Sequence, residues 1–178
     1  MRRDTAVFEH AHPRRGEDGT WSVDLNLRKP GVYRAYADFK IDGKQRMLAT
    51  DLFVPGDFRP NRLPAPASTA STQDESGQPA GGLEVALKAS RIRASGETPL
   101  TFAVTRDGRP FDGLEPYLGA TGHLVALREG DLAYLHVHPI ERGSEHTHED
   151  GPETTEAHAN DVPFMATFPT AGRYRLFL

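Results

Sequence analysis

Apolar and polar residues alternate along this chain with the two-residue period of a β-strand. Thr20–Leu27 (TWSVDLNL) alternates strictly, with Trp21 and three aliphatic side chains on one face, and this predicts a half-buried antiparallel strand. Leu100–Thr105 alternates in the same way and precedes Asp107 and Gly108, a residue pair typical of β-hairpin turns. No stretch shows the apolar stripe of an amphipathic helix. The pattern predicts an all-β protein.

Further short apolar runs extend this picture. Leu83–Leu87, Phe164–Phe168 and Arg173–Leu178 each have the length and composition of a strand, and Ala37–Val54 has those of a hairpin. The 178 residues include 17 glycines and 14 prolines, which suit turns between many short strands. Strands of this spacing favour antiparallel β-sandwiches of immunoglobulin-like or cupredoxin-like type.

The chain contains an internal repeat. Arg2–Pro13 (RRDTAVFEHAHP) matches Arg128–Pro139 (REGDLAYLHVHP) at a constant offset, so each copy predicts a strand that ends in His-x-His-Pro. Downstream, Lys29–Tyr36 (KPGVYRAY) matches Thr170–Phe177 (TAGRYRLF). Two matched blocks in the same order indicate a tandem duplication rather than chance similarity.

The repeat divides the chain into three parts. Residues 1–54 form the C-terminal part of a first β-sandwich repeat, and 83–178 form a second repeat with a His-rich and acidic insert at 140–160. The segment 55–82 between them is a Pro-, Ser- and Gly-rich linker. The first copy begins at a position that aligns with the middle of a hairpin in the second copy. The second copy ends before it reaches strands equivalent to those that follow the matched blocks in the first. We therefore expect a first copy truncated at its N-terminus, a second copy that lacks its last strand, and self-association through unpaired strand edges.

Composition and charge argue against several classes of partner. The net charge of −4 and the scattered basic residues provide no electrostatic footprint for nucleic acid. No apolar run approaches the roughly 18 residues that cross a bilayer, so we expect no membrane insertion by this chain. No apolar stretch follows Arg2 and Arg3, so no signal peptide is predicted. The chain has no cysteine, which excludes disulfides and thiolate metal ligands.

Histidines point to a metal site in the second copy. His136 and His138 alternate on a strand and project from one face. The turn before them sets the position of His123. A two-residue loop of Gly130 and Asp131 places His123 opposite His138, and a four-residue loop places it opposite His136. Either register gathers three imidazoles at one end of a hairpin, a donor set suited to Cu(II) or Zn(II). A three-residue loop would place His123 opposite residue 137 and weaken the site.

The insert adds a second His-x-His pair, His146 and His148, among acidic residues. The predicted metal ligands are therefore His123, His136, His138, His146 and His148. Two simpler interpretations stay open: the strand histidines have a structural role at a strand end, and the insert is an ordinary solvated acidic loop. The first copy keeps His10 and His12 as a two-ligand remnant.

Two blocks carry a resemblance to a known family. Tyr117–Pro139 (YLGATGHLVALREGDLAYLHVHP) and Phe168–Leu178 (FPTAGRYRLFL) resemble exported or membrane-anchored bacterial proteins, mostly actinobacterial, that carry two such β domains. Members of this family are often described as secreted or heavy-metal-binding. The resemblance implies an extracellular or cell-envelope location and an immunoglobulin-like or cupredoxin-like sandwich.

Two functions fit these observations. The first is a non-catalytic, exported module that binds copper or zinc, and the second is a structural or interaction domain of the cell envelope, for adhesion or spacing. An enzymatic function has little support, because the chain lacks the nucleophile-elbow, phosphate-loop, zinc-protease and dinucleotide-binding motifs. We expect no enzyme, and a metal hydrolase or oxidase built on His123, His136 and His138 is the weakest alternative.

Overall fold

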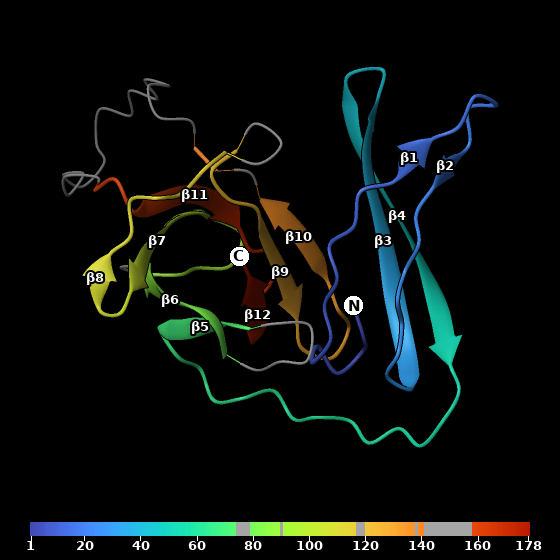
Figure 1. The fold of residues 1–178 in the computed structure, drawn as a ribbon, viewed down its shortest axis with the longest axis horizontal. Helices are drawn as coiled ribbons and strands as arrows, with labels where there is room; N and C mark the ends of the chain where they lie inside the picture. Colours follow the sequence, from blue (N-terminus) through green and yellow to red (C-terminus); the bar gives the residue numbers. More distant parts are fainter. Residues whose placement is uncertain (74–78, 90, 117–119, 138, 141–157) are drawn as a thin grey trace. The chain divides into compact units, whose positions relative to one another are not determined.

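The computed structural model describes residues 1–73, 79–89, 91–116, 120–137, 139–140 and 158–178. Within these ranges the regular secondary structure consists of β-strands, and every named strand pair is antiparallel. The chain divides into two units (Figure 1). The first comprises Met1–Pro64 and Glu129–Leu132, and the second comprises Ala65–Arg128 and Ala133–Leu178. The prediction of an all-β protein is confirmed.

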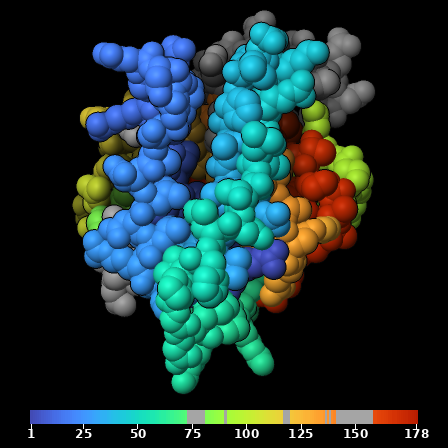
Figure 2. Space-filling model, turned by 90° about the vertical axis from the view of Figure 1, so that its right-hand side faces the viewer, coloured from blue at the N-terminus to red at the C-terminus, as the bar shows by residue number. Residues whose placement is uncertain are grey.

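The first unit is built on one long hairpin. Its strands are β1 (Arg14–Arg15), β2 (Trp21–Ser22), β3 (Gly31–Ile41) and β4 (Lys44–Val54). β3 and β4 pair along all eleven residues of each strand. Asp42 and Gly43 join them with φ angles of 49° and 73°, and two successive positive φ angles are the signature of a type I′ turn. The hairpin predicted within Ala37–Val54 is therefore confirmed, and Figure 2 shows its side chains, light blue to teal, at the surface.

The half-buried strand predicted at Thr20–Leu27 is wrong. Only Trp21 and Ser22 form strand structure, paired with β1, and the Trp21 side chain is 63% exposed. Val23 and Leu25 on the same predicted face are also exposed. Alternation gives a half-buried strand only where a second layer covers the apolar face, and no such layer covers these residues in the described part of the first unit.

The second unit consists of two antiparallel sheets. The larger contains β5 (Thr69–Gln73), β6 (Pro79–Lys88), β7 (Glu97–Arg106), β8 (Arg109–Pro110) and β11 (Asp161–Thr167). Its order is β11-β7-β6-β5, and β8 pairs with β7. The smaller contains β9 (Leu124–Arg128), β10 (Tyr134–Val137) and β12 (Tyr174–Phe177), in the order β10-β9-β12.

One hydrophobic core joins the two sheets. Leu100, Phe102 and Phe164 of the larger sheet share this core with Leu124 and Val137 of the smaller one. The rings of Phe102 and Phe164 meet edge to face with centroids 5.7 Å apart, a favoured aromatic geometry. Two sheets that face each other across a common core form a β-sandwich-like arrangement.

Most strands predicted in this unit are present, with shifted bounds. The strand predicted at Leu100–Thr105 is β7, and Asp107 and Gly108 have the φ angles of 51° and 71° that a type I′ turn into β8 requires. The segment 55–82 is not all linker, because β5 and the start of β6 lie within it. The small and polar residues of this segment gave no strand signal in the sequence, because its strands pair through backbone hydrogen bonds and have no apolar face.

The two matched sequence blocks have matching local structure. The Arg2 amide donates to the Val7 carbonyl at 2.8 Å, and the Arg128 amide donates to the Ala133 carbonyl at 3.1 Å. These four residues occupy equivalent positions in the aligned blocks. An equivalent backbone hydrogen bond therefore closes the loop at the start of each copy of Arg-(x)₇-His-x-His-Pro.

The second block shows the same agreement. The Tyr33 hydroxyl donates to the Lys29 carbonyl at 2.7 Å, and the Tyr174 hydroxyl donates to the Thr170 carbonyl at 2.9 Å. In each copy the tyrosine ties the start of its strand to the residue four positions earlier. A tyrosine that bonds to nearby upstream backbone is a recurrent corner device in β-sandwiches.

Candidate metal site

The β9–β10 hairpin fixes the register around the predicted histidine site. Val125 lies opposite His136, and the ladder runs to Leu124 opposite Val137. This is the register that the two-residue loop predicted, and the register that puts His123 opposite His136 is wrong. The loop itself is longer, because the amide of Arg128 donates to the carbonyl of Ala133. The longer loop keeps the same centre and hence the same register.

The five predicted ligands are described to different extents. His123 directly precedes β9 and is half-buried, and its Nδ1 atom is buried. The backbone of His136 lies in β10. His138, His146 and His148 lie outside the described residues.

Backbone pairing continues beyond the His-x-His pair. Pro139 forms an antiparallel bridge with Phe164 of β11, and the Ile140 amide donates to the Pro163 carbonyl at 2.9 Å. Val137 pairs within the smaller sheet and Pro139 bridges to the larger one. The chain therefore passes from one sheet to the other at the end of the His-x-His-Pro sequence.

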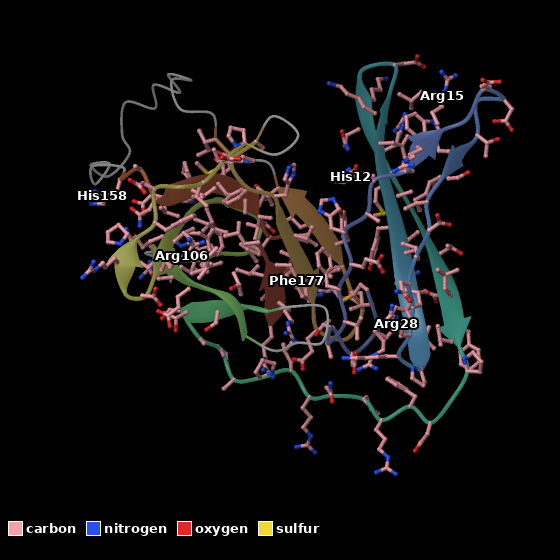
Figure 3. All side chains as sticks on the ribbon, in the orientation of Figure 1. His12, Arg15, Arg28, Arg106, His158 and Phe177 are labelled. Carbon is pink, nitrogen blue, oxygen red and sulfur yellow. The ribbon has the colours of Figure 1, made fainter. Side chains whose placement is uncertain are left out.

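The His-x-His pair of the first copy is fully described. His10 and His12 lie on the extended segment before β1, where Figure 3 labels His12, and both side chains are exposed. Their ring centroids are 4.8 Å apart, with an angle of 41° between the ring planes. The Phe8 ring also lies near His10, with centroids 6.4 Å apart. Two adjacent exposed imidazoles can offer nitrogen ligands to one borderline metal ion.

The described residues do not supply a complete metal site. Among residues that the structure describes, no group of three or more His, Asp or Glu side chains is arranged to hold an ion. At the end of the insert, the exposed His158 donates its amide to Asp161, whose carboxylate also accepts a bond from Lys88 at 3.1 Å. Asp161 thus pairs with protein groups from two segments.

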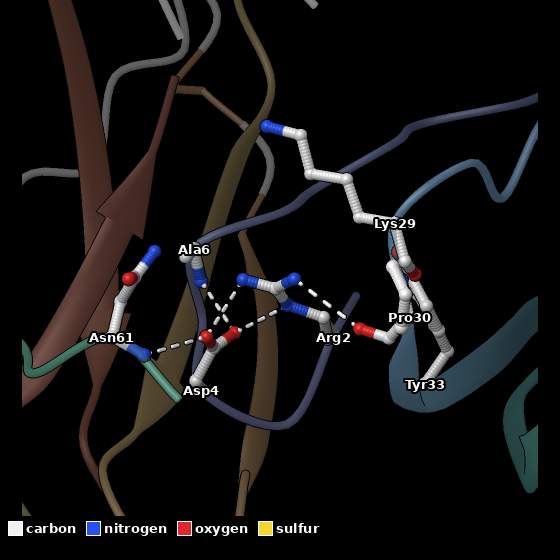
Figure 4. A network of polar contacts seen from close by, with 7 residues as sticks. All are labelled: Arg2, Asp4, Ala6, Lys29, Pro30, Tyr33 and Asn61. Carbon is white, nitrogen blue, oxygen red and sulfur yellow. Dashed lines mark hydrogen bonds and ion pairs between the residues drawn. The ribbon is translucent and has the colours of Figure 1, made fainter. Parts of the chain in front are cut away.

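A buried polar network lies near the amino terminus (Figure 4). The Arg2 guanidinium donates two hydrogen bonds to the Asp4 carboxylate, at 2.9 and 2.8 Å, and one to the Pro30 carbonyl at 3.3 Å. Asp4 also accepts bonds from the amides of Ala6 and Asn61. Sequence reasoning missed this network, and the repeated Arg at the start of each copy was the signal that could have found it.

The network determines the charge state of Asp4. Burial by itself would raise the pKa of this carboxyl, but the hydrogen bonds from Arg2, Asn61 and Ala6 outweigh burial and lower the pKa below its ordinary value of 3.8. Burial raises the pKa of the nearby Tyr33 hydroxyl. The network is thus a buried ion pair that also binds the carbonyl of Pro30, the residue before β3.

Comparison with known proteins gives a family. The model of the domain of unknown function DUF8832 matches residues 1–56 and 78–178. The chain belongs to the DUF8832 family. No curated protein and no solved structure matches it.

The DUF8832 match covers the residues of interest in both copies. His10, His12, His123 and His136 lie in the matched ranges, and 57–77 lies outside them. In the part of this DUF8832 chain that the structure describes, no helix is long and apolar enough to span a membrane.

Proposed function

We propose that this DUF8832 chain is a non-catalytic module that binds Cu(II) or Zn(II) through its His-x-His sequences. The observation that carries the proposal is the pair of exposed imidazoles of His10 and His12, whose centroids lie 4.8 Å apart. An exposed imidazole pair of this kind suits borderline divalent ions, which accept nitrogen ligands at about 2.0–2.1 Å.

The second copy carries the fuller donor set. His136 and His138 are equivalent to His10 and His12 in the repeat, and His123 is added from the neighbouring strand. The observed β9–β10 register supports this set, because one further pair in the same register joins positions 123 and 138. His146 and His148 of the insert are proposed to complete the coordination.

The finer fold is part of the proposal. We propose tandem immunoglobulin-like or cupredoxin-like repeats, supported by two shared features of the copies. The Arg2–Val7 bond matches the Arg128–Ala133 bond, and each repeat tyrosine bonds to the carbonyl four residues earlier. An extracellular or cell-envelope location is proposed on the family resemblance of the blocks around the His-x-His-Pro sequence.

Calorimetric titration with Cu(II) and Zn(II) at neutral pH tests the metal role. We expect sub-micromolar, one-to-one binding that disappears in His136→Ala/His138→Ala. His10→Ala/His12→Ala is the matched variant in the first copy, and it should remove only a second, weaker event. A third variant without residues 144–158 measures the share of the insert. Sub-micromolar binding that persists in the His136→Ala/His138→Ala variant, or wild-type binding that is weak throughout, would contradict the proposal.

A second function is favoured by the surface of the first unit. Several large apolar side chains are exposed there, namely Trp21, Val23, Leu25, Phe39, Ile41, Met47, Leu48, Phe53 and Phe58. Monomeric proteins rarely expose many such side chains in one region. A structural or interaction domain of the cell envelope would use them for contacts with other proteins. Full retention of partner binding in the histidine variants would favour this function over metal binding.

A further inference from the structure

The two exposed imidazoles of the first copy lie at the spacing of a chelating pair. A Zn(II) ion lies about 2.0–2.1 Å from a nitrogen ligand, so the centroid of a bound imidazole ring is about 3.2 Å from the ion. Two such rings have centroids about 5.2 Å apart at the tetrahedral angle and about 4.5 Å apart at a right angle. The ring centroids of His10 and His12 are 4.8 Å apart. One ion can therefore accept a nitrogen atom from each ring.

The backbone favours this arrangement of the pair. His10 and His12 are two residues apart on an extended segment, and side chains at this spacing project to the same face. Pro13 follows directly, and a proline favours extended backbone at the residue before it. β1 begins at the next residue, Arg14, and is paired with β2. The two rings are thus presented together without a change in the fold.

Two nitrogen ligands leave the zinc site incomplete. Structural Zn(II) sites are four-coordinate and tetrahedral. Among the residues that the structure describes, no group of three or more His, Asp or Glu side chains is arranged to hold one ion. Glu9, the acidic residue next to the pair, alternates with the two histidines, and alternate residues of an extended segment point to opposite faces. His10 and His12 therefore supply half of a tetrahedral site.

A second copy of the chain supplies the other half with the same chemistry. Both rings are exposed, so another molecule can reach an ion that they hold. A two-fold axis through the ion makes the two imidazole pairs equivalent, and such a contact closes at two copies. Water can also complete the shell of the ion, but a second pair replaces two waters together. Once one ring of that pair has bound, the other binds at a high effective concentration.

We propose that Zn(II) joins two copies of this chain through His10 and His12 of each copy. This inference rests on the proposed metal binding of the His-x-His sequences, and it names the partner at the first of them. In the second copy of the repeat, the proposed site adds His123 to His136 and His138 of the same chain. The two His-x-His pairs therefore differ in stoichiometry: one ion per chain at the second, and one ion per two chains at the first.

A zinc titration followed by sedimentation equilibrium of the full chain tests the bridge. At about 100 µM chain, the wild type should remain monomeric until one equivalent of Zn(II) has filled the tighter site, and should dimerise over the next half equivalent. In His136→Ala/His138→Ala, the dimer should be complete at half an equivalent in total. A large excess of zinc should reverse the dimer, because each imidazole pair then holds its own ion.

Further variants identify the bridging residues. His10→Ala/His12→Ala should stay monomeric at every zinc concentration and keep the one-to-one binding event. His12→Ala leaves one imidazole per chain and should raise the dissociation constant of the zinc-bound dimer at least about a hundredfold. Glu9→Gln is the matched control, since it changes the exposed neighbour of His10 without removal of an imidazole, and it should change this constant by less than about threefold.

X-ray absorption at the zinc edge then counts the ligands. His136→Ala/His138→Ala with half an equivalent of zinc should show four imidazole nitrogens at about 2.0 Å. A variant without residues 144–158 should keep the dimer, because the bridge does not use the insert. Circular dichroism of each variant establishes that the chain is folded.

The outcomes separate this bridge from the metal binding on which it rests. Zinc bound at His10 and His12 of a chain that stays monomeric would overturn the bridge and leave metal binding intact. A zinc-dependent dimer that persists in His10→Ala/His12→Ala, or that needs the insert, would also overturn it. A chain that binds no zinc in calorimetry would overturn both proposals.

Discussion

The ion pair between Arg2 and Asp4 is buried, so the loss of either partner is costly. Their side chains are only 8% and 3% exposed. The carboxylate has four donors around it, and the guanidinium also reaches the Pro30 carbonyl. Removal of one partner from such a pair leaves the other charge buried without compensation.

We therefore expect Asp4→Asn to lower the free energy of unfolding by about 3 kcal/mol, measured by urea denaturation at pH 7. Asp18→Asn is the matched control, since Asp18 also accepts bonds from a neighbouring backbone amide and hydroxyl, those of Thr20, but is exposed. The control should shift the urea midpoint much less. Equal losses in the two variants would contradict a special role for burial.

The same pair predicts a pH dependence. The pKa of Asp4 is lower in the folded chain than its ordinary value of 3.8, so the stabilisation is present above about pH 4 and is lost as the pH falls through the folded value. The gap in unfolding free energy between wild type and Asp4→Asn should be largest near neutrality and shrink below about pH 4. A gap that stays constant down to pH 2 would show that charge is not its source.

The two repeat tyrosines offer a paired test at the same scale. Tyr33 is 2% exposed, so Tyr33→Phe leaves the Lys29 carbonyl without its donor and should cost about 1 kcal/mol. The Tyr174 bond is exposed, and water can replace the hydroxyl there. Tyr174→Phe should therefore cost about half as much or less. Urea unfolding of both variants measures the difference, and the reverse order would be inconsistent with the role of burial.

At the scale of elements, glycine decides where β3 can begin. Gly31 has a φ angle of 134°, and a Cβ there would lie 3.0 Å from Arg2 Cδ and from Phe58. Gly43 in the β3–β4 turn has a φ angle of 73°, and its Cβ would meet nothing within 4 Å. Gly31 therefore has both a steric and a conformational constraint, and Gly43 has only the second.

Gly31→Ala should lower the free energy of unfolding by about 2–3 kcal/mol, and Gly43→Ala by about 1 kcal/mol. Thermal or urea unfolding of the two variants checks the order. If Gly43→Ala lowers the free energy of unfolding more than Gly31→Ala does, the stability of the first unit depends more on the conformation of the β3–β4 turn than on the contact between Gly31 and Arg2.

The sequence predicts those elements whose signal is local. Asp-Gly pairs readily adopt the positive φ angles of a type I′ turn, so the turns at 42–43 and 107–108 were predictable from two residues each. The strand predicted at Thr20–Leu27 was wrong, because alternation in the sequence describes an apolar face but does not show whether a second layer covers that face. The sequence did not predict β5, for the opposite reason. Its sequence TASTQ has no apolar face, and its pairing with β6 depends on backbone hydrogen bonds.

The candidate site was predictable to a similar degree. The repeat identified the His-x-His pairs. The spacing of the hairpin limited the residue opposite His123 to a few alternatives, one for each register, and one of these registers is observed. Loop length could not be read directly, because the four residues between Arg128 and Ala133 keep the same centre as a two-residue loop. The repeated Arg pointed to Arg2, but its full network was not predictable, since the Pro30 carbonyl and the Asn61 amide come from distant segments.

At the largest scale, the second unit depends on contacts between its layers. From Val162 onward β11 alternates in its burial: Phe164 is fully buried in the core, and Met165 beside it is 41% exposed. Phe164 also contacts Phe102 of β7 and shares the core with residues of β9 and β10. One side chain therefore couples the larger sheet to the smaller.

Phe164→Ala should consequently lower the free energy of unfolding by about 3–5 kcal/mol, because it removes apolar contacts with both sheets and leaves a cavity. Met165→Ala changes the next side chain of the same strand, but on the solvent face, and should cost less than about 1 kcal/mol. Urea denaturation followed by far-ultraviolet circular dichroism measures both. Similar losses of unfolding free energy in the two variants would mean that the sheets do not depend on a common core. A shared core makes the loss large at Phe164, which faces it, and small at Met165, which faces solvent.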